Sequence, residues 1–390
     1  MRVVFCGGGT GGHVYPALTV AAALRRLCAD AGEPLDLLYV GVAGKIDAEL
    51  VARDDIPFRG VTAGPLRVGS LLGTAKGLLK LVAGTTQAVA ILRKFKPDVV
   101  FATGGYGCAG VAIAARLLRR PLLLFEPGPE AGLAVRLLTR IARRVAVTIP
   151  PALEARPAAK TLLTGYPVRP AFFEATRDES RRCLGLDPDL PVLLLSGASS
   201  GANVLNRAVA AWAPNLLATC QLLHLCGARD LPWLQSERAK LPADRQARWQ
   251  LHAYLHDEMA QALAAADLAV MRSGASVLGE LPAARLPAVL VPGEYEGWDQ
   301  SANARYLEAE GAALLLPQSR LDELQAIVTA LLADAPRLQK MRDALARLAQ
   351  PDAADRLAGL IMEMAGVPTS PPAAASPSPP AERGTGGVRS

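Results

Sequence analysis

The stretch VVFCGGGTGGHVYPAL, residues 3–18, decides the fold of this chain. Its first four residues are apolar and lead into a run of glycines, as buried strands of parallel sheets often do. Residues 16–30 then have the length and apolar spacing of a helix. A strand, a glycine-rich turn and a helix in this order predict the first unit of an open parallel sheet, with backbone N–H groups and a helix N-terminus exposed at the turn.

The same alternation of short apolar runs and helical stretches continues along the chain and then starts again. Strand-like runs lie at residues 35–40, 98–102, 122–125 and 145–148, and a second series lies at 191–196, 221–226, 268–271 and 287–291. The segment TGYPVRP, residues 164–170, lies between the two series. We therefore predict an α/β protein with two Rossmann-like, doubly wound parallel-sheet domains, residues 1–163 and 164–345. A helix at 346–365 is expected to pack back on the first domain, and residues 366–390, rich in Pro, Ala, Ser and Gly, are expected to form a disordered tail.

The composition narrows the class of protein. Of the 390 residues, 51% are hydrophobic, which supports sizeable cores and excludes wholesale disorder. Only 5% are aromatic and the formal net charge is +6, so no nucleic-acid partner is predicted. The six cysteines form no CxxC pair and are expected to be buried thiols in a reducing compartment. No signal peptide is recognised, and charged or small residues interrupt every apolar run, so we expect a cytoplasmic protein without a membrane-spanning helix.

Positive charge is concentrated between residues 66 and 144, which hold 13 Lys and Arg and three Asp and Glu. Within this segment, apolar residues lie among basic ones. The patch consists of Leu71, Leu72, Lys76, Leu78, Leu79, Lys80 and Val82. Apolar side chains beside a basic cluster suit docking on an anionic lipid surface, and a plain solvated basic face is the simpler alternative.

The first glycine turn also fits the pattern G-x-G-x-x-G of dinucleotide-binding dehydrogenases. Such a protein needs an acidic residue at the end of its second strand to hold a ribose. Here that strand ends in GVAG at 41–44, and Asp36 lies at its start, so an NAD-dependent oxidoreductase is the weakest alternative. His13 directly follows the glycines, where an imidazole can be a general base or an anchor in a cleft; a helix-capping role is the structural alternative.

A second glycine turn, GASSGA at 197–202, follows the strand-like run 191–196. One such turn at the head of each domain suggests two domains that face one another, each with a helix N-terminus directed at a shared cleft. That arrangement suits a nucleotide-sugar donor on one side and a large acceptor on the other. Asp187-Pro188-Asp189 has the DxD spacing of some metal sites, but its proline favours a turn, so no metal site is predicted.

Several motifs together resemble one known family, the MurG N-acetylglucosaminyltransferases of peptidoglycan synthesis. They are GGGTGGHVYPAL (7–18), KPDVVFATGGYG (96–107), TGYPVRP (164–170), GASSGA (197–202), RSGASVLGELPAARLPAVLVP (272–292) and DQSANA (299–304). The likeness runs from residue 1 to about 365 and implies the GT-B architecture, two Rossmann-like domains facing a deep cleft. It further implies an inverting transfer of N-acetylglucosamine from UDP-N-acetylglucosamine to the 4-hydroxyl of undecaprenyl-pyrophosphoryl-N-acetylmuramyl-pentapeptide, with no cofactor and no essential metal. The implied location is the cytoplasmic face of the inner membrane, with cell-wall synthesis and division proteins as partners.

The resemblance also implies roles for individual residues. The expected donor-binding residues are Arg169, Ser199, Leu255, Arg272, Ser276, Val277, Glu280, Asp299 and Gln300. Among them, the backbone near Leu255 is expected to read the uracil and Glu280 to accept hydrogen bonds from the ribose hydroxyls, while Arg169 and Arg272 either contact the donor or hold the cleft. The expected acceptor and cleft residues are Thr10, Gly11, Gly12, Gly105, Tyr106, Glu126 and Gly128. His13 is the candidate base that takes the proton of the attacking hydroxyl.

Departures from the family pattern lie mainly on the acceptor side. Where the family shows His-Glu-Gln-Asn, this chain has FEPG at 125–128, and a further Asn is replaced by Val135. In the donor half, Ala198 replaces a glycine and Asp299 replaces a Gln or His. Two alternatives therefore stay open: a related transferase that uses a different lipid acceptor, and a non-catalytic membrane-associated scaffold.

Overall fold

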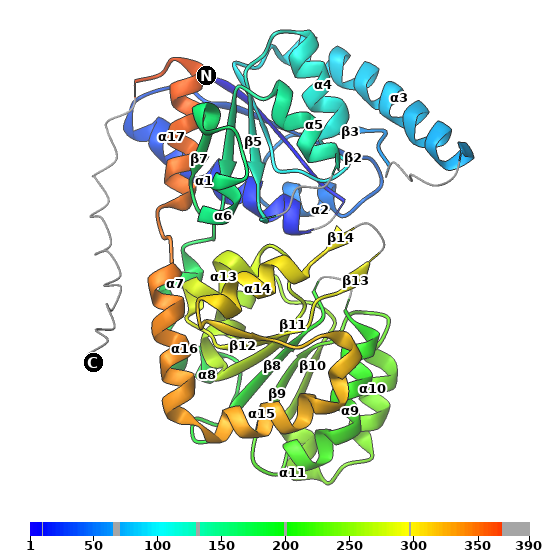
Figure 1. The fold of residues 1–390 in the computed structure, drawn as a ribbon, viewed down its shortest axis with the longest axis vertical. Coiled ribbons are helices and arrows are strands. Elements are labelled where there is room, and N and C mark those ends of the chain that lie inside the picture. The colour runs from blue at the N-terminus through cyan, green and yellow to red at the C-terminus, as the bar shows by residue number, and fades with distance from the viewer. Residues whose placement is uncertain (10, 65–70, 130–132, 199–200, 296–297, 369–390) are drawn as a thin grey trace, which may run out of the picture.

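The computed structural model describes residues 1–9, 11–64, 71–129, 133–198, 201–295 and 298–368. It contains two helix-covered parallel sheets, one above the other in Figure 1. The predicted α/β class with two doubly wound parallel sheets is confirmed. The predicted tail falls largely outside the described residues.

The N-terminal sheet has seven parallel strands in the order β3-β2-β1-β4-β5-β6-β7. Their bounds are β1 Arg2–Cys6, β2 Asp36–Val42, β3 Phe58–Val61, β4 Val99–Ala102, β5 Leu122–Glu126, β6 Arg144–Val147 and β7 Thr161–Leu163. The helices of this half are α1 Gly11–Asp30, α2 Asp47–Ala52, α3 Leu71–Phe95, α4 Ala109–Leu117, α5 Leu133–Ile141, α6 Pro150–Glu154 and the 3₁₀ turn η1 Ala158–Lys160.

The C-terminal sheet has six parallel strands in the order β10-β9-β8-β11-β12-β15. Their bounds are β8 Val192–Ser196, β9 Gln221–Leu225, β10 Trp249–His252, β11 Leu268–Met271, β12 Ala288–Leu290 and β15 Ala313–Leu315; the separate antiparallel pair is β13 Glu294–Tyr295 and β14 Trp298–Asp299. The helices are α7 Ala171–Glu174, α8 Arg177–Cys183, α9 Asn203–Leu216, α10 Leu231–Ala239, α11 Ala243–Ala247, α12 Met259–Ala265, α13 Val277–Ala284, α14 Ser301–Ala309, η2 Gln318–Glu323, α15 Leu324–Ala333 and α16 Ala335–Leu348.

Alternating side chains of the central strands fill the cores on both faces of the sheets. In β8, Val192 and Leu194 pack in the core that continues to the N-terminal domain, whereas Leu193 and Leu195 pack in the core under α9 and α15. Such strands are buried on both sides, and therefore read as unbroken apolar runs in the sequence.

The strand order fixes where a ligand can bind. In each sheet the order reverses beside the first strand of the domain, between β1 and β4 and between β8 and β11. Ligands of open parallel sheets bind at this switch point, outside the carboxyl ends of the strands. The two glycine turns follow β1 and β8, and the motifs at 103–107 and 272–276 follow β4 and β11. All four therefore lie at the switch points.

The chain returns to the N-terminal domain at its last described helix, α17 (Ala353–Ala365). This helix packs along α1, as Figure 1 shows, and its Asp355 forms an ion pair with Arg26 of α1. Its buried face includes Leu357 and Ile361. The two halves are thus joined twice, by the segment 164–170 and by the segment between α16 and α17.

One helix of the described chain, α3, is long and apolar enough over Gly73–Phe95 to cross a membrane by length and composition alone, although none was expected. In the structure α3 packs along α4 as part of the N-terminal domain. The contact is close because Gly110 of α4 lies against Gly84 and Thr85, where an added Cβ would come within 3.1 Å of the Thr85 nitrogen.

Candidate active site between the two domains

A buried carboxylate that the sequence analysis missed holds the first glycine turn. Asp47, at the start of α2, accepts hydrogen bonds from the backbone N–H of Gly9 (3.0 Å) and of Val42 (2.9 Å), and its side chain is inaccessible to solvent. Gly8 has φ +132°, and a Cβ there would lie 2.0 Å from Asp47 Oδ2, so this position requires glycine. The end of the second strand has no acidic residue, as the sequence indicated; Asp47 comes later, at the start of α2, and its carboxylate binds the backbone of the glycine turn.

His13 lies directly beyond this turn with its ring fixed by β4. Its Nδ1 lies 2.9 Å from the carbonyl oxygen of Thr103, and Thr103 Oγ1 donates to the carbonyl of His13 at 2.6 Å. Because a carbonyl oxygen only accepts, Nδ1 carries the hydrogen and the lone pair of the neutral ring is on Nε2. Burial lowers the pKa of His13 from its ordinary value, while the Thr103 hydrogen bond and the charge of Asp47 act in the opposite direction. A neutral imidazole in one tautomer is what a general base requires.

The turn after β4 closes around the His13 ring. Gly105 has φ +74°, and a Cβ on it would lie 3.0 Å from His13 Cδ2. Tyr106 lies against the first glycine turn, where a Cβ on Gly9 would come within 2.7 Å of the Tyr106 hydroxyl. The structure thus brings together His13, Gly105 and Tyr106 from the predicted set, next to Gly11 and Gly12 at the start of α1.

Glu126, predicted to be on the acceptor side, has both carboxylate oxygens engaged within its own domain. Oε1 accepts from Thr139 Oγ1 (2.8 Å) and Oε2 accepts from Arg156 Nε (2.7 Å), with the side chain only 2% exposed. An acceptor contact would have to displace one of these partners, so the structure gives Glu126 an anchoring function and its contact with an acceptor stays a prediction.

The segment after β5 faces the other domain. A Cβ on Gly128 would lie 3.3 Å from Asn303 Oδ1 of α14. Asn303 donates from Nδ2 to the Ser273 carbonyl (2.8 Å), whereas its Oδ1 is buried with no hydrogen-bond partner within the described ranges, and the residue is only 7% exposed. A buried, unsatisfied oxygen beside the domain boundary is suited to accept a hydrogen bond from a bound hydroxyl. Asn303 is thus a candidate site residue whose signal in the sequence was only its place in the DQSANA motif.

Two other predicted donor residues have well-defined protein partners. Gln300 accepts from the backbone N–H of Gly293 at 2.9 Å, which fixes the start of α14. Arg272 donates to the carbonyl of Pro292 (2.8 Å) and to Gln318 Oε1 (2.6 Å). Of the two roles open for Arg272, holding the cleft is therefore the one with contacts in the structure, and donor contact stays a prediction.

The N-terminus of α13 forms the second half of the candidate site. Ser276 precedes its first residue, Val277, and Glu280 lies one turn further, where its backbone N–H donates to the Ser276 carbonyl at 2.8 Å. Burial raises the pKa of Glu280, against the effects of Ser276 and of positively charged Arg169. Free N–H groups at a helix start attract an anion, and a carboxylate one turn away can accept from two neighbouring hydroxyls.

Residues at the boundary connect the two halves. Tyr166 of the linking segment donates to the Gly12 carbonyl at 3.4 Å. Arg169 donates to the carbonyl of His256 at 2.9 Å and to Asp257 at 3.1 Å, so it holds the loop that contains Leu255. His256 therefore lies at the domain boundary.

Some predicted site residues fall outside the described parts of the chain. These are Thr10 and Ser199, and the side chains of Asp299, Leu71 and Leu72. The DxD sequence is described, and the N–H of Asp189 donates to Asp187 Oδ1 at 2.9 Å, which confirms the predicted turn. Among the described residues, no group of three or more His, Cys, Asp or Glu could hold a metal ion.

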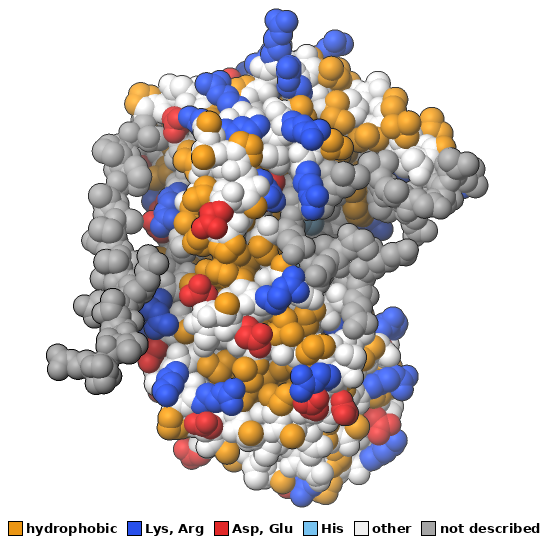
Figure 2. All heavy atoms as spheres, in the orientation of Figure 1, with side chains coloured by type: hydrophobic (Ala, Val, Ile, Leu, Met, Phe, Trp, Pro, Cys, Tyr) orange, Lys and Arg blue, Asp and Glu red, His pale blue; other side chains and the backbone are white. Residues whose placement is uncertain are grey.

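The predicted membrane patch is exposed on α3 and continues onto its neighbours. Leu78, Leu79 and Val82 are 55%, 70% and 58% exposed, and Figure 2 shows apolar side chains over α3. Leu117 of α4 and Leu137 of α5 are also exposed. Exposed basic residues on these helices and at their ends include Lys76, Lys80, Arg93, Lys94, Lys96, Arg116, Arg119, Arg136, Arg140 and Arg143. The mixed apolar and basic surface therefore spans three helices, more than the sequence predicted.

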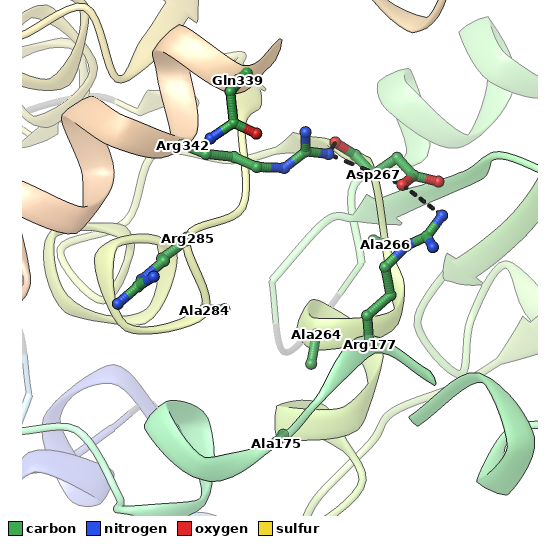
Figure 3. A pocket seen from close by; sticks show the side chains of 9 residues that line it. All are labelled: Ala175, Arg177, Ala264, Ala266, Asp267, Ala284, Arg285, Gln339 and Arg342. Carbon is green, nitrogen blue, oxygen red and sulfur yellow. Dashed lines mark hydrogen bonds and ion pairs between the residues drawn. The ribbon is translucent and has the colours of Figure 1, made fainter. Parts of the chain in front are cut away.

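A pocket of about 460 Å³ lies away from the candidate site, at the amino end of β11 (Figure 3). Asp267 at its wall binds Arg181 (2.6 Å) and Arg177 (3.2 Å), with Arg342 at 3.8 Å. The amino ends of the strands form the edge opposite the glycine turns. This cluster is therefore an ion-pair network that ties α8 and α16 to the sheet, separate from the switch point.

Two parallel-sheet domains with facing switch points, and a histidine directly beyond the first glycine turn, are the arrangement of a GT-B glycosyltransferase. The chain belongs to glycosyltransferase family 28: residues 3–147 match the family's N-terminal domain and residues 192–357 its C-terminal domain.

Relatives similar to this chain include a UDP-N-acetylglucosamine–N-acetylmuramyl-(pentapeptide) pyrophosphoryl-undecaprenol N-acetylglucosamine transferase of Roseiflexus sp., 38% identical, covering 93% of this chain and 94% of the relative. The protein of the same name from Desulforudis audaxviator is also 38% identical, covering 94% of this chain and 99% of the relative. Among solved structures, MurG of Acinetobacter baumannii is 26% identical with a TM-score of 0.67, over 93% of this chain and 99% of that one. A UDP-GlcNAc 2-epimerase from Neisseria meningitidis, 13% identical over 93% of this chain and 100% of that one, has a TM-score of 0.65 and shows the fold alone.

Proposed function

We propose that this chain transfers N-acetylglucosamine from UDP-N-acetylglucosamine to the 4-hydroxyl of undecaprenyl-pyrophosphoryl-N-acetylmuramyl-pentapeptide, with inversion at the sugar. The observation that carries the proposal is the likeness of more than nine-tenths of the chain to relatives named for this transfer. The fold alone would not distinguish transfer from epimerisation, because an epimerase shares it. A fixed imidazole in the acceptor-side turn supports transfer.

The donor half supports a UDP-sugar. In this proposal, the N–H groups that follow Ser276 bind the pyrophosphate and Glu280 accepts from the ribose hydroxyls. The backbone near Leu255 reads the uracil, and Gln300 and Asn303 meet the hydroxyls of the sugar. The buried, unsatisfied Oδ1 of Asn303 supports this last assignment.

The chemical step is a single displacement. The acceptor hydroxyl attacks C1 of the sugar from the face opposite the pyrophosphate, His13 Nε2 takes the hydroxyl proton, and the C1–O bond breaks with its electron pair leaving on UDP. The helix N-terminus of α13 stabilises the charge that develops on the leaving group, so we expect transfer without an essential metal. Undiminished activity in a chelator would agree with this expectation.

The acceptor is membrane-bound, and the surface of α3, α4 and α5 is our proposed docking face on the cytoplasmic side of the inner membrane. Its exposed leucines supply apolar contact, while its arginines and lysines attract anionic lipids. Cell-wall synthesis and division proteins are proposed partners at the same membrane.

A different lipid acceptor is the second candidate function. It is favoured by Gly128, which provides no side-chain amide where the domains face one another. A non-catalytic scaffold is disfavoured by the ordered geometry around His13 and Glu280.

The decisive experiment measures UDP release by the purified protein from UDP-N-acetylglucosamine, with and without a short-chain analogue of the muramyl-pentapeptide lipid. Acceptor-dependent release that is lost in His13→Gln is expected. Release with another polyprenyl-linked sugar only would support the second candidate. Binding of UDP without any release would support the scaffold, and Glu280→Ala with unchanged UDP affinity would contradict the donor-site assignment.

A further inference from the structure

Six side chains form a continuous cluster across the domain boundary. The N-terminal domain contributes Tyr15 of α1 and Arg53 after α2; the linking segment contributes Arg169; the loop between β10 and α12 contributes Tyr254, His256 and Asp257. We call the last three, together with Leu255, the 254–257 loop.

The hydroxyl of Tyr15 is the centre of a hydrogen-bond chain. Tyr254 donates to Tyr15 Oη at 3.3 Å, and Tyr15 Oη lies 3.3 Å from His256 Nδ1. Because the Tyr15 oxygen accepts from Tyr254, its own hydrogen is available to the His256 nitrogen. The rings of Tyr254 and His256 meet edge to face, with centroids 4.6 Å apart. One hydroxyl of the N-terminal domain therefore ties together two residues of the 254–257 loop.

Arginines hold the same loop from two further directions. Asp257 accepts from Arg53 at 2.6 Å and from Arg169 at 3.1 Å, one on each carboxylate oxygen. The guanidinium of Arg169 lies 5.3 Å from the Tyr15 ring centre, which is the range of a cation–π contact. The Asp257 side chain is 72% exposed, so its ion pairs are screened by salt, whereas the Tyr15 contacts are partly buried.

We propose that Tyr15 and Arg53 are positioning residues for the nucleotide donor: they hold the 254–257 loop from the opposite domain and thereby couple occupancy of the donor site to the placement of His13. The inference rests on the proposed function, in which this loop reads the uracil. Tyr15 lies two residues after His13 on α1, so the two residues move together as parts of one helix. The start of the same helix also contacts Tyr166 through the Gly12 carbonyl.

The test is a double-mutant cycle on UDP affinity with Tyr15→Phe and Tyr254→Phe. Loss of a neutral hydrogen bond corresponds to about 2- to 12-fold in an equilibrium constant, so each single variant is expected to weaken UDP binding by that factor. The double variant is expected to be little worse than Tyr15→Phe alone, because Tyr15→Phe already removes the bond to Tyr254 together with the bond to His256. The donor KM should rise in parallel while the KM of the lipid analogue stays unchanged.

The matched control is Tyr39→Phe. The Tyr39 hydroxyl is buried in the N-terminal sheet with no hydrogen-bond partner among the described residues, so its removal tests loss of a tyrosine hydroxyl without loss of a domain contact. Arg53→Gln is expected to weaken UDP binding about 2-fold in low salt and not at all in high salt, in contrast to Tyr15→Phe.

Calorimetric UDP binding keeps this test separate from the proposed function. A wild-type protein that binds UDP but transfers no sugar would contradict the proposed transferase function, and the double-mutant cycle on UDP affinity could still be measured. Additive effects of the two tyrosine variants, or unchanged UDP affinity in a folded Tyr15→Phe protein, would overturn the coupling. A wild-type protein that does not bind UDP would overturn both.

Discussion

Replacement of Asp47 tests whether the first glycine turn depends on its buried carboxylate. Asp47→Ala removes two hydrogen bonds from a charged acceptor, those of Gly9 and Val42. Bonds to a charged group contribute about 1.5–3 kcal/mol each, so the free energy of unfolding is expected to fall by about 3–6 kcal/mol. Asp47→Asn keeps one accepting oxygen for one of these two backbone N–H groups but turns an N–H donor toward the other. The free energy of unfolding is therefore expected to fall by about 2–3 kcal/mol in this variant. Against a typical total of about 5–15 kcal/mol, the Asn variant remains folded and can be assayed.

The assay combines urea unfolding, UDP calorimetry and acceptor-dependent UDP release. Asp47→Asn is expected to lower transfer at least about 10-fold, because the turn that positions His13 is loosened, and to leave UDP affinity unchanged. Asp36→Asn is the matched control, since its carboxylate is exposed and its ion pair among the described residues is a 3.6 Å contact with Arg2. A folded Asp47→Asn protein with wild-type stability and wild-type transfer would refute the reasoning.

Four further predictions follow from individual residues. Burial lowers the pKa of His13, so the fall in the transfer rate on the acid side of the pH profile should have its midpoint below pH 6.5. The midpoint should be lower still in Asp47→Asn, because the charge of Asp47 raises the pKa of His13, and a midpoint above pH 7 would exclude His13 as the base. Ala198 has φ +63°, a left-handed conformation that disfavours Ala, so Ala198→Gly should raise the free energy of unfolding by up to about 1 kcal/mol, and a lowered melting temperature would contradict this. Leu79→Ser should weaken binding to anionic vesicles at least about 3-fold without changing transfer to a water-soluble acceptor, and equal vesicle binding would remove α3 from the docking face. Burial lowers the pKa of His224 to about 3, so protonation of this residue favours the unfolded chain. The free energy of unfolding should therefore fall from pH 6.5 toward pH 3, by about 1.4 kcal/mol per pH unit. His224→Gln should flatten this slope, and an unchanged slope in the variant would show that His224 is not the titrating group.

The central strands were predictable from the sequence and the edge strands were not. Each of the nine predicted strand-like runs overlaps a strand of the structure, because a central strand is buried on both faces and is apolar throughout. Within the two parallel sheets, the strands that were missed are β3, β7, β10 and β15, which are the outermost ones, and the separate antiparallel pair of β13 and β14 was missed as well. Each of the four outermost strands has only three or four residues and is largely half-buried or exposed, so its apolar signal is short; the run AALLL at 312–316, which contains β15, was not recognised as a strand.

Candidate site residues could be predicted from the sequence where they belong to a motif at a switch point. They could not be predicted where their role depends on contacts between residues that are distant in the sequence. His13 and Glu280 stand in recognisable motifs. The role of Asp47 depends on α2 folding back over a glycine turn 38 residues earlier, and Tyr15 meets His256 across 241 residues. The motif that contains Glu126 likewise gave no sign that Thr139 and Arg156 bind its carboxylate.

The return of α17 to the first domain makes the second domain a topological insertion. In sequence the C-terminal domain lies between β7 and α17, and both of these elements belong to the N-terminal domain in space. The apolar face of α17, with Leu357 and Ile361, covers the N-terminal core beside α1. During synthesis, therefore, the N-terminal domain leaves the ribosome first but completes its folding last. One side of α1 stays uncovered until the whole C-terminal domain and then α17 have emerged.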